Sequence, residues 1–143
     1  MGKKRIVKKG GEGENAAGRG SSSRGSRRKM DSGRLYVEAT YNNTKLSLTD
    51  ATGNVVSWSS SGSLGFAGAK KGTPFAAAKV GELLGDRAVA MGVKEIDVIV
   101  SGVGSGRESS IRAFVTKGIH INTIKDTTPV PHNGPKSPKP RRV

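Results

Sequence analysis

The chain has 143 residues, a formal net charge of +14 at pH 7, no cysteine and only two histidines. These numbers exclude disulfides, thiolate catalysis and cysteine-bound zinc, so we expect no metal and no other cofactor. The length fits one domain with its own core, and no apolar run approaches the roughly 20 residues of a membrane span. We therefore expect no membrane partner.

The positive charge is concentrated at the two ends of the chain. Residues 1–30 carry a net +8 and residues 131–143 a net +4, whereas residues 31–130 carry only +2. Two basic arms on a nearly neutral centre are typical of a protein with a polyanionic partner. Solubilising tails are the alternative. The first arm, residues 1–33, also has the Arg- and Ser-rich composition of an organellar transit peptide, but its few apolar residues favour a disordered RNA-binding arm.

Alternation of apolar and polar residues predicts three antiparallel strands near residues 35–40, 45–49 and 55–60. Asn42 and Asn43 separate the first two strands and could adopt the positive φ angles of a tight turn. On the third strand, Trp58 fits either the core or a stacking contact with an unpaired base.

Glycines interrupt residues 61–72 and predict a long loop without regular structure. This loop carries Lys70 and Lys71, and its Phe66 fits base stacking and local packing equally well. A loop of this kind presents cations without fixing their geometry.

Thr73 as a cap and Pro74 at the first helical position predict a helix that ends at Gly92. Gly81 and Gly85 weaken this helix by about 1 kcal/mol each relative to alanine. We therefore expect a close approach of the helix to the sheet at these two positions.

A buried strand at residues 95–101 leads into glycines at 102, 104 and 106 and then into a second helix, an order that usually indicates phosphate binding. The spacing of Ser105 and Glu108 predicts a capping box and a helix that begins at Gly106. Its buried face should hold Ile111, Phe114 and Val115.

The phosphate is not expected to belong to a nucleotide cofactor. Arg107 stands where a dinucleotide fingerprint needs its third glycine, no lysine follows Gly106 as a P-loop requires, and no Ser-His-Asp arrangement is present. The protein should therefore not be an enzyme. Backbone amides of residues 104–106, with Arg107 and Arg112 on the helix, could instead bind a phosphate of a nucleic acid backbone. A solvated arginine beside a simple turn is the alternative.

A last strand ends at Asp126, and five prolines in the thirteen residues 129–141 then force an extended tail. The expected organisation is an α/β domain at residues 34–127 followed by a basic C-terminal arm at residues 128–143. The element order β-β-β-α-β-α-β implies a mixed five-stranded sheet with right-handed crossovers.

Four segments, taken together, resemble one known family. They are "YNNTKLSLTDATGNVVSW", "GFAGAKKGTPFAAAKVGE", "GVGSGRESSIRA" and "IKDTTPVPHNGPKSPKPRRV". In this order they are similar to the universal small ribosomal subunit protein eleven family in its bacterial form, over residues 34–143. The family's glycine loop usually alternates glycine with proline, whereas this chain has Val103 and Ser105.

The resemblance implies a three-layer α/β domain with helices on the faces of the sheet, in the platform of the small ribosomal subunit near the path of exiting messenger RNA. It implies small-subunit ribosomal RNA as partner, with small-subunit proteins six, eighteen and twenty-one as neighbours and seven across the exit channel. The ribosome would be cytoplasmic, with an organellar ribosome as the alternative. A nucleoid-type DNA binder and a protein-binding module are the competing classes. The residues expected to bind RNA are Asn42, Asn43, Lys70, Lys71, Gly104, Gly106, Arg107, Arg112, His132, Asn133, Lys136, Lys139, Arg141 and Arg142.

Overall fold

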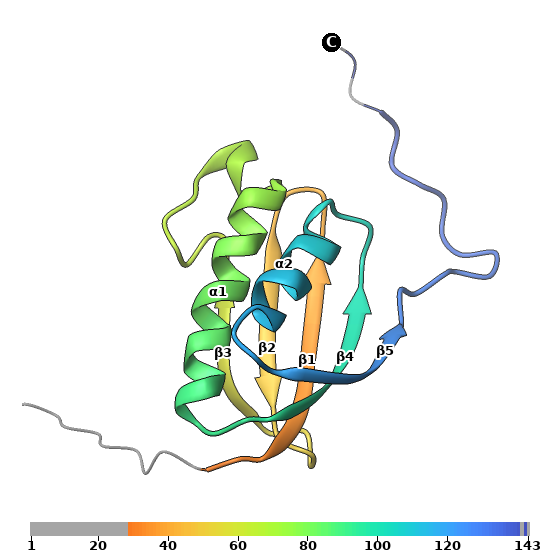
Figure 1. Cartoon of the computed structure of the whole chain (residues 1–143). Coiled ribbons are helices and arrows are strands. Elements are labelled where there is room, and N and C mark those ends of the chain that lie inside the picture. The colour runs from red at the N-terminus through yellow and green to blue at the C-terminus, as the bar shows by residue number, and fades with distance from the viewer. Residues whose placement is uncertain (1–28, 141, 143) are drawn as a thin grey trace, which may run out of the picture.

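The computed structural model describes residues 29–140 and 142, and the rest of the N-terminal arm and Arg141 lie outside the described residues. It is a single α/β domain with a five-stranded sheet and two α-helices (Figure 1). The elements in chain order are β1 (Ser32–Ala39), β2 (Thr44–Thr49), β3 (Val55–Ser60), the 3-10 helix η1 (Gly68–Gly72), α1 (Pro74–Ala90), β4 (Glu95–Ser101), α2 (Gly106–Val115) and β5 (His120–Asp126). The predicted order is confirmed, although η1 lies in a loop that was expected to be irregular.

The strands are arranged in the order β3-β2-β1-β4-β5. Strand β2 is antiparallel to β1 and β3, whereas β1 is parallel to β4, which is parallel to β5. The predicted mixed sheet is thus confirmed. Four strands, β1, β3, β4 and β5, run in the same direction, so their carboxyl ends meet at one end of the molecule.

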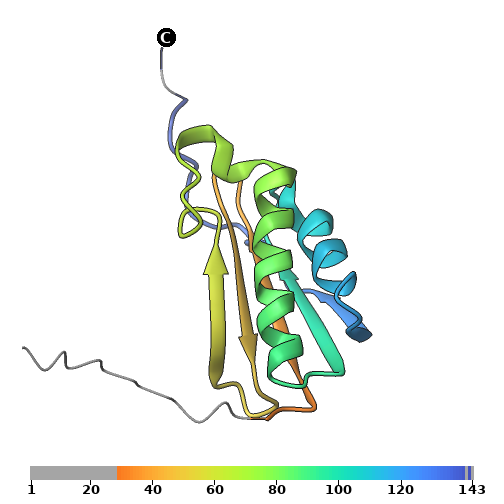
Figure 2. The same cartoon turned by 60° about the vertical axis from the view of Figure 1, so that its left-hand side comes forward.

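Both helices lie on the same face of the sheet, side by side (Figure 2). The domain has two layers, and the expectation of three layers was wrong. The reason is the handedness of the connections: β3-α1-β4 and β4-α2-β5 both join strands of the same direction and both advance the same way across the sheet. Right-handed crossovers then place both helices on one face.

Small residues let the two helices approach closely. A Cβ atom built on Gly81 would lie 2.3 Å from the carbonyl oxygen of Ser110, and one on Gly85 would lie 2.7 Å from Cγ of Lys117. The expected packing reason for these glycines exists, but the partner is α2 and not the sheet. Thr73 caps α1 as predicted, because its hydroxyl accepts a hydrogen bond from the amide of Ala76.

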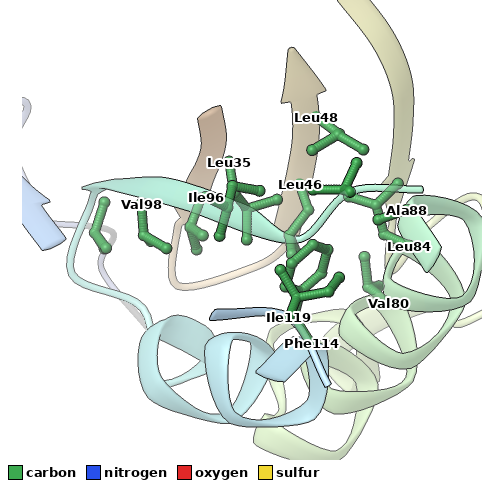
Figure 3. Packing of buried hydrophobic residues seen from close by; sticks show 13 residues of the cluster. Leu35, Leu46, Leu48, Val80, Leu84, Ala88, Ile96, Val98, Phe114 and Ile119 are labelled. Atoms are coloured by element: carbon green, nitrogen blue, oxygen red, sulfur yellow. The ribbon is translucent and has the colours of Figure 1, made fainter. Parts of the chain in front are cut away.

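The hydrophobic core lies between the helices and the covered face of the sheet (Figure 3). Every second residue of β1, β2 and β4 points into it, as alternation predicts. Phe114 is the largest fully buried side chain. Val115, predicted for the buried face of α2, is 37% exposed, and Ala113 is buried in its place. The main core residues are Leu35, Val37, Leu46, Leu48, Val80, Leu84, Ile96, Val98, Val100, Phe114 and Ile119.

The opposite face of the sheet is not covered by any described element, and we call it the open face. Trp58 is 54% exposed there and Val55 is 59% exposed, so Trp58 is not a core residue. Lys45 and Glu38 form an ion pair at 3.5 Å on the same face. At the outer edge of β3, the Arg87 guanidinium donates a hydrogen bond to the carbonyl oxygen of Trp58 at 3.2 Å.

Candidate nucleic-acid interface

Three loops meet where the carboxyl ends of β1, β3, β4 and β5 converge, and we call this part of the molecule the loop end. They are residues 40–43, 61–73 and 102–105. The amide of Gly104 donates to the carbonyl of Ala39 at 2.8 Å, and the Ser105 hydroxyl donates to the carbonyl of Gly72 at 2.8 Å. These bonds join loops that are far apart in the sequence into one surface.

The glycines of the 102–105 loop and the start of α2 serve close packing. A Cβ atom on Gly104 would lie 2.2 Å from the carbonyl oxygen of Thr40, and one on Gly106 would lie 2.3 Å from the Thr44 hydroxyl. Both glycines are buried. The amide of Gly104 is already bonded, so the prediction of a free phosphate-binding amide at this position was wrong.

The predicted capping box is also absent. Ser105 has helical dihedral angles, and its hydroxyl bonds Gly72 and not the first turn of α2. Glu108 forms an ion pair with Arg112 at 3.5 Å, and both of these side chains are more than 80% exposed. Exposed pairs of this kind contribute little to stability, so this pair does not fix the position of Arg112.

Arg107 is the centre of a polar network that ties the arm to the loop end. Its guanidinium donates to the carbonyl of Gly102, to the Thr128 hydroxyl and to the Asp126 carboxylate, the last at 2.5 Å. Hydrogen bonds from the hydroxyl and amide of Thr128, and then from Arg107, lower the pKa of Asp126 to about 2. The arginine is therefore neither a solvated side chain nor an open clamp, contrary to both predictions.

The arm leaves the domain from this network. The amide of Thr127 donates to the carbonyl of Val100, and the amide of Gly102 donates to the Thr128 hydroxyl, so the first two residues after β5 are held against the end of β4. From residue 129 the described arm is exposed and has no helix or strand. Its end lies beyond the loop end in both views (Figures 1 and 2). The predicted arm residues His132, Asn133, Lys136, Lys139 and Arg142 are all exposed.

The other predicted residues gather at the loop end. Lys70 is exposed and Lys71 half-buried, both on η1, beside the turn that contains Asn42 and Asn43. That turn has no positive φ at either asparagine and is closed by the amide of Thr40 donating to the carbonyl of Asn43, so the expected turn type was wrong.

Asn133 has a φ of 54° and is the non-glycine residue with positive φ in the described part of the chain.

Sequence reasoning missed two exposed aromatic residues at the loop end. Tyr41 is 78% exposed and Phe75 is 65% exposed. Phe66 packs against Phe75 edge to face, with ring centroids 6.1 Å apart. The position of Phe75 one residue after the proline that begins α1 could have pointed to it, because side chains in a first helical turn have few neighbours.

Nothing in residues 29–140 and 142 resembles a centre for metal chemistry, since no three His, Asp or Glu side chains are grouped there. Within the same residues no helix is long and apolar enough to cross a membrane. The fold and the loop end define a small α/β domain with an extended basic arm, a class typical of proteins that bind nucleic acid.

A family model described as ribosomal protein S11 matches residues 33–142. Three similar proteins, each named small ribosomal subunit protein uS11, come from Gloeobacter violaceus, a Synechococcus species and Thermosynechococcus vestitus. The first is 49% identical over 87% of this chain and 96% of its own length, and the other two are 50% identical over 86% and 95%. The chain belongs to the ribosomal protein S11 family. It is a structural ribosomal protein and not an enzyme, as expected.

Proposed function

We propose that the chain is a structural constituent of the small ribosomal subunit and binds small-subunit ribosomal RNA in the platform, near the path of exiting messenger RNA. Its neighbours are small-subunit proteins six, eighteen and twenty-one, with seven across the exit channel. The ribosome is cytoplasmic. The resemblance to this family supports each of these assignments.

The basic arm held at the loop end is the observation that carries the proposal. Residues 127–143 contain four basic side chains and no acidic one, and η1 adds Lys70 and Lys71. The one acid at the root of the arm, Asp126, is neutralised by Arg107. A dense polyanion is the partner that such a surface fits, because each cation that replaces a condensed counterion adds affinity.

The domain and the arm have different tasks in this proposal. The arm threads between RNA helices and becomes ordered on binding, and its lysines and arginines supply affinity. The nearly neutral domain supplies position. Arg107 contributes by fixing the direction in which the arm leaves. The proposed RNA contacts are Asn42, Asn43, Lys70, Lys71, Arg112, His132, Asn133, Lys136, Lys139, Arg141 and Arg142, whereas Gly104 and Gly106 are buried and serve packing.

Salt dependence of binding tests the role of the arm. We would replace Lys136, Lys139, Arg141 and Arg142 by glutamine and measure the affinity for small-subunit ribosomal RNA over a range of salt concentrations. Loss of four phosphate contacts should lower the slope of log affinity against log salt by about three. The matched control replaces four basic residues at the opposite end of the domain, and these are Arg34, Arg87, Lys94 and Lys117.

The control variant distinguishes RNA binding through the arm from a general effect of net charge on affinity. A loss in the slope that is confined to the arm variant supports the proposal. Equal losses in both variants would mean that net charge alone drives binding and would refute the assignment to the arm. Equal affinity of the unaltered protein for duplex DNA and for ribosomal RNA would favour a nucleoid-type DNA binder instead. Ultraviolet crosslinking in cells then identifies the RNA, and reads gathered in a few platform helices are the expected result.

A further inference from the structure

Phe75 stands out among the aromatic residues at the loop end because its ring is mostly exposed and lines a hollow. It is 65% exposed on the first turn of α1, and the edge-to-face contact with Phe66 covers only part of it. Together with Leu64 and Lys79, the two rings line an open hollow of about 350 Å³. A large apolar ring left in solvent beside a hollow is typical of a binding surface.

Positive charge predominates around this hollow. No aspartate or glutamate occurs between Val55 and Gly81, whereas three lysines do. Lys79 places its ammonium 5.7 Å from the centroid of the Phe75 ring, and its ion pair with Glu82 at 3.0 Å is exposed and easily exchanged. The other two lysines, Lys70 and Lys71, are on η1, which directly precedes α1. The hollow therefore suits a partner that combines a flat apolar surface with negative charge.

We propose that Phe75 stacks on an unpaired base of RNA, while Lys79 and the η1 lysines bind the adjoining phosphates. Every base has a flat π face, so stacking does not depend on the nucleotide sequence, and the adjoining phosphate carries negative charge. A nucleotide therefore fits both the exposed aromatic ring and the lysines around the hollow. This inference rests on the proposed function, because it assumes that the loop end faces ribosomal RNA.

The open face provides the contrast that makes the choice of Phe75 specific. Trp58 is also an exposed aromatic residue, but it lies beside one lysine and one acid, Lys45 and Glu38, that balance each other. Around Phe75, three lysines are present with a single acid, Glu82. A surface of balanced charge has no particular affinity for a polyanion. Stacking on RNA is therefore assigned to Phe75 and not to Trp58.

The test compares variants of the full chain for binding to small-subunit ribosomal RNA in the presence of transfer RNA as competitor. Phe75→Leu keeps an apolar side chain but removes the aromatic face, and it should weaken binding roughly tenfold, as loss of one stacked base does. Phe75→Tyr keeps the face and should bind like the original. Trp58→Leu is the matched control and should also leave the affinity unchanged. Melting curves check that each variant is folded.

Ultraviolet crosslinking followed by peptide mass spectrometry gives a second readout. The peptide that contains Phe75 should carry a crosslinked nucleotide, and this adduct should disappear in Phe75→Leu. Unchanged affinity of Phe75→Leu, combined with weaker binding when Lys70 and Lys71 are replaced by glutamine, would overturn the stacking inference and leave the proposed function standing. No preference of the unaltered protein for ribosomal RNA over transfer RNA would overturn both. Loss of a neighbouring protein from particles assembled with Phe75→Leu, at unchanged RNA affinity, would show a protein contact and also overturn stacking.

Discussion

Replacing Gly81 by alanine should destabilise the domain although alanine is the better helix former. Alanine gains about 1 kcal/mol of helix propensity. The new Cβ, however, would lie 2.3 Å from the carbonyl oxygen of Ser110, a backbone atom that cannot rotate away. Helix α2 must then move outward by most of an ångström, and overpacking of this kind costs about 3 kcal/mol. The expected net loss in the free energy of unfolding is about 2 kcal/mol.

Gly85→Ala is the matched control on the same helix. Its Cβ would meet Cγ of Lys117 at 2.7 Å and the carbonyl oxygen of Phe114 at 3.3 Å, and the lysine side chain can turn away. The gain in propensity should offset this smaller cost, so the stability should stay within about 1 kcal/mol of the original. Urea denaturation followed by circular dichroism measures both variants. A Gly81→Ala variant as stable as Gly85→Ala would refute the close contact between α1 and α2.

Four further predictions concern the core, the cap and the network at the arm. Phe114→Ala should lose about 3–5 kcal/mol in urea denaturation, because the ring fills the centre of the core. Thr73→Ala should lose about 1 kcal/mol in the same assay through the missing cap of α1. Asp126 has a lowered pKa, so its stabilisation is present above its ordinary value of 3.8 and is lost as pH falls from there to about 2. The melting temperatures of the original protein and Asp126→Asn should therefore converge over that interval. Arg107→Ala should remain folded but enter small subunits poorly in cells, and normal incorporation would contradict the role of the network.

The order of the elements could be predicted because local signals agree along the chain. Apolar alternation marks β1 and β2, and Thr73 with Pro74 marks the start of α1. The number of layers did not follow from these signals. Period-two alternation identifies two faces of a strand but does not say which face is covered, so Trp58 could be placed on either. The burial of one face depends on where both crossover helices lie.

The candidate site was predictable in its residues and not in its geometry. A glycine-rich turn before a helix has the same sequence pattern whether its amides are free or bonded. The amide of Gly104 is bonded because the carbonyl of Ala39 lies beside it, and the carbonyl of Thr40 leaves no room for a side chain at this position. Both carbonyl groups belong to residues more than sixty positions earlier. Arg107 likewise finds its partner 19 positions later, at Asp126. Contacts of this range are set by the fold as a whole.

The hydrogen bond from Arg87 to the carbonyl of Trp58, at the outer edge of β3, has a consequence for the protein before it is assembled into a ribosome. A chain waiting to be assembled exposes its edge strands, and their unbonded backbone groups are templates for aggregation between copies. On β3, the Arg87 guanidinium donates a hydrogen bond to the carbonyl of Trp58, and the amide of Leu64 donates one to the carbonyl of Ser60 at 3.2 Å. A second chain cannot pair along this edge without breaking both bonds. A long charged side chain from α1 thus protects an edge strand that has no neighbouring strand of its own.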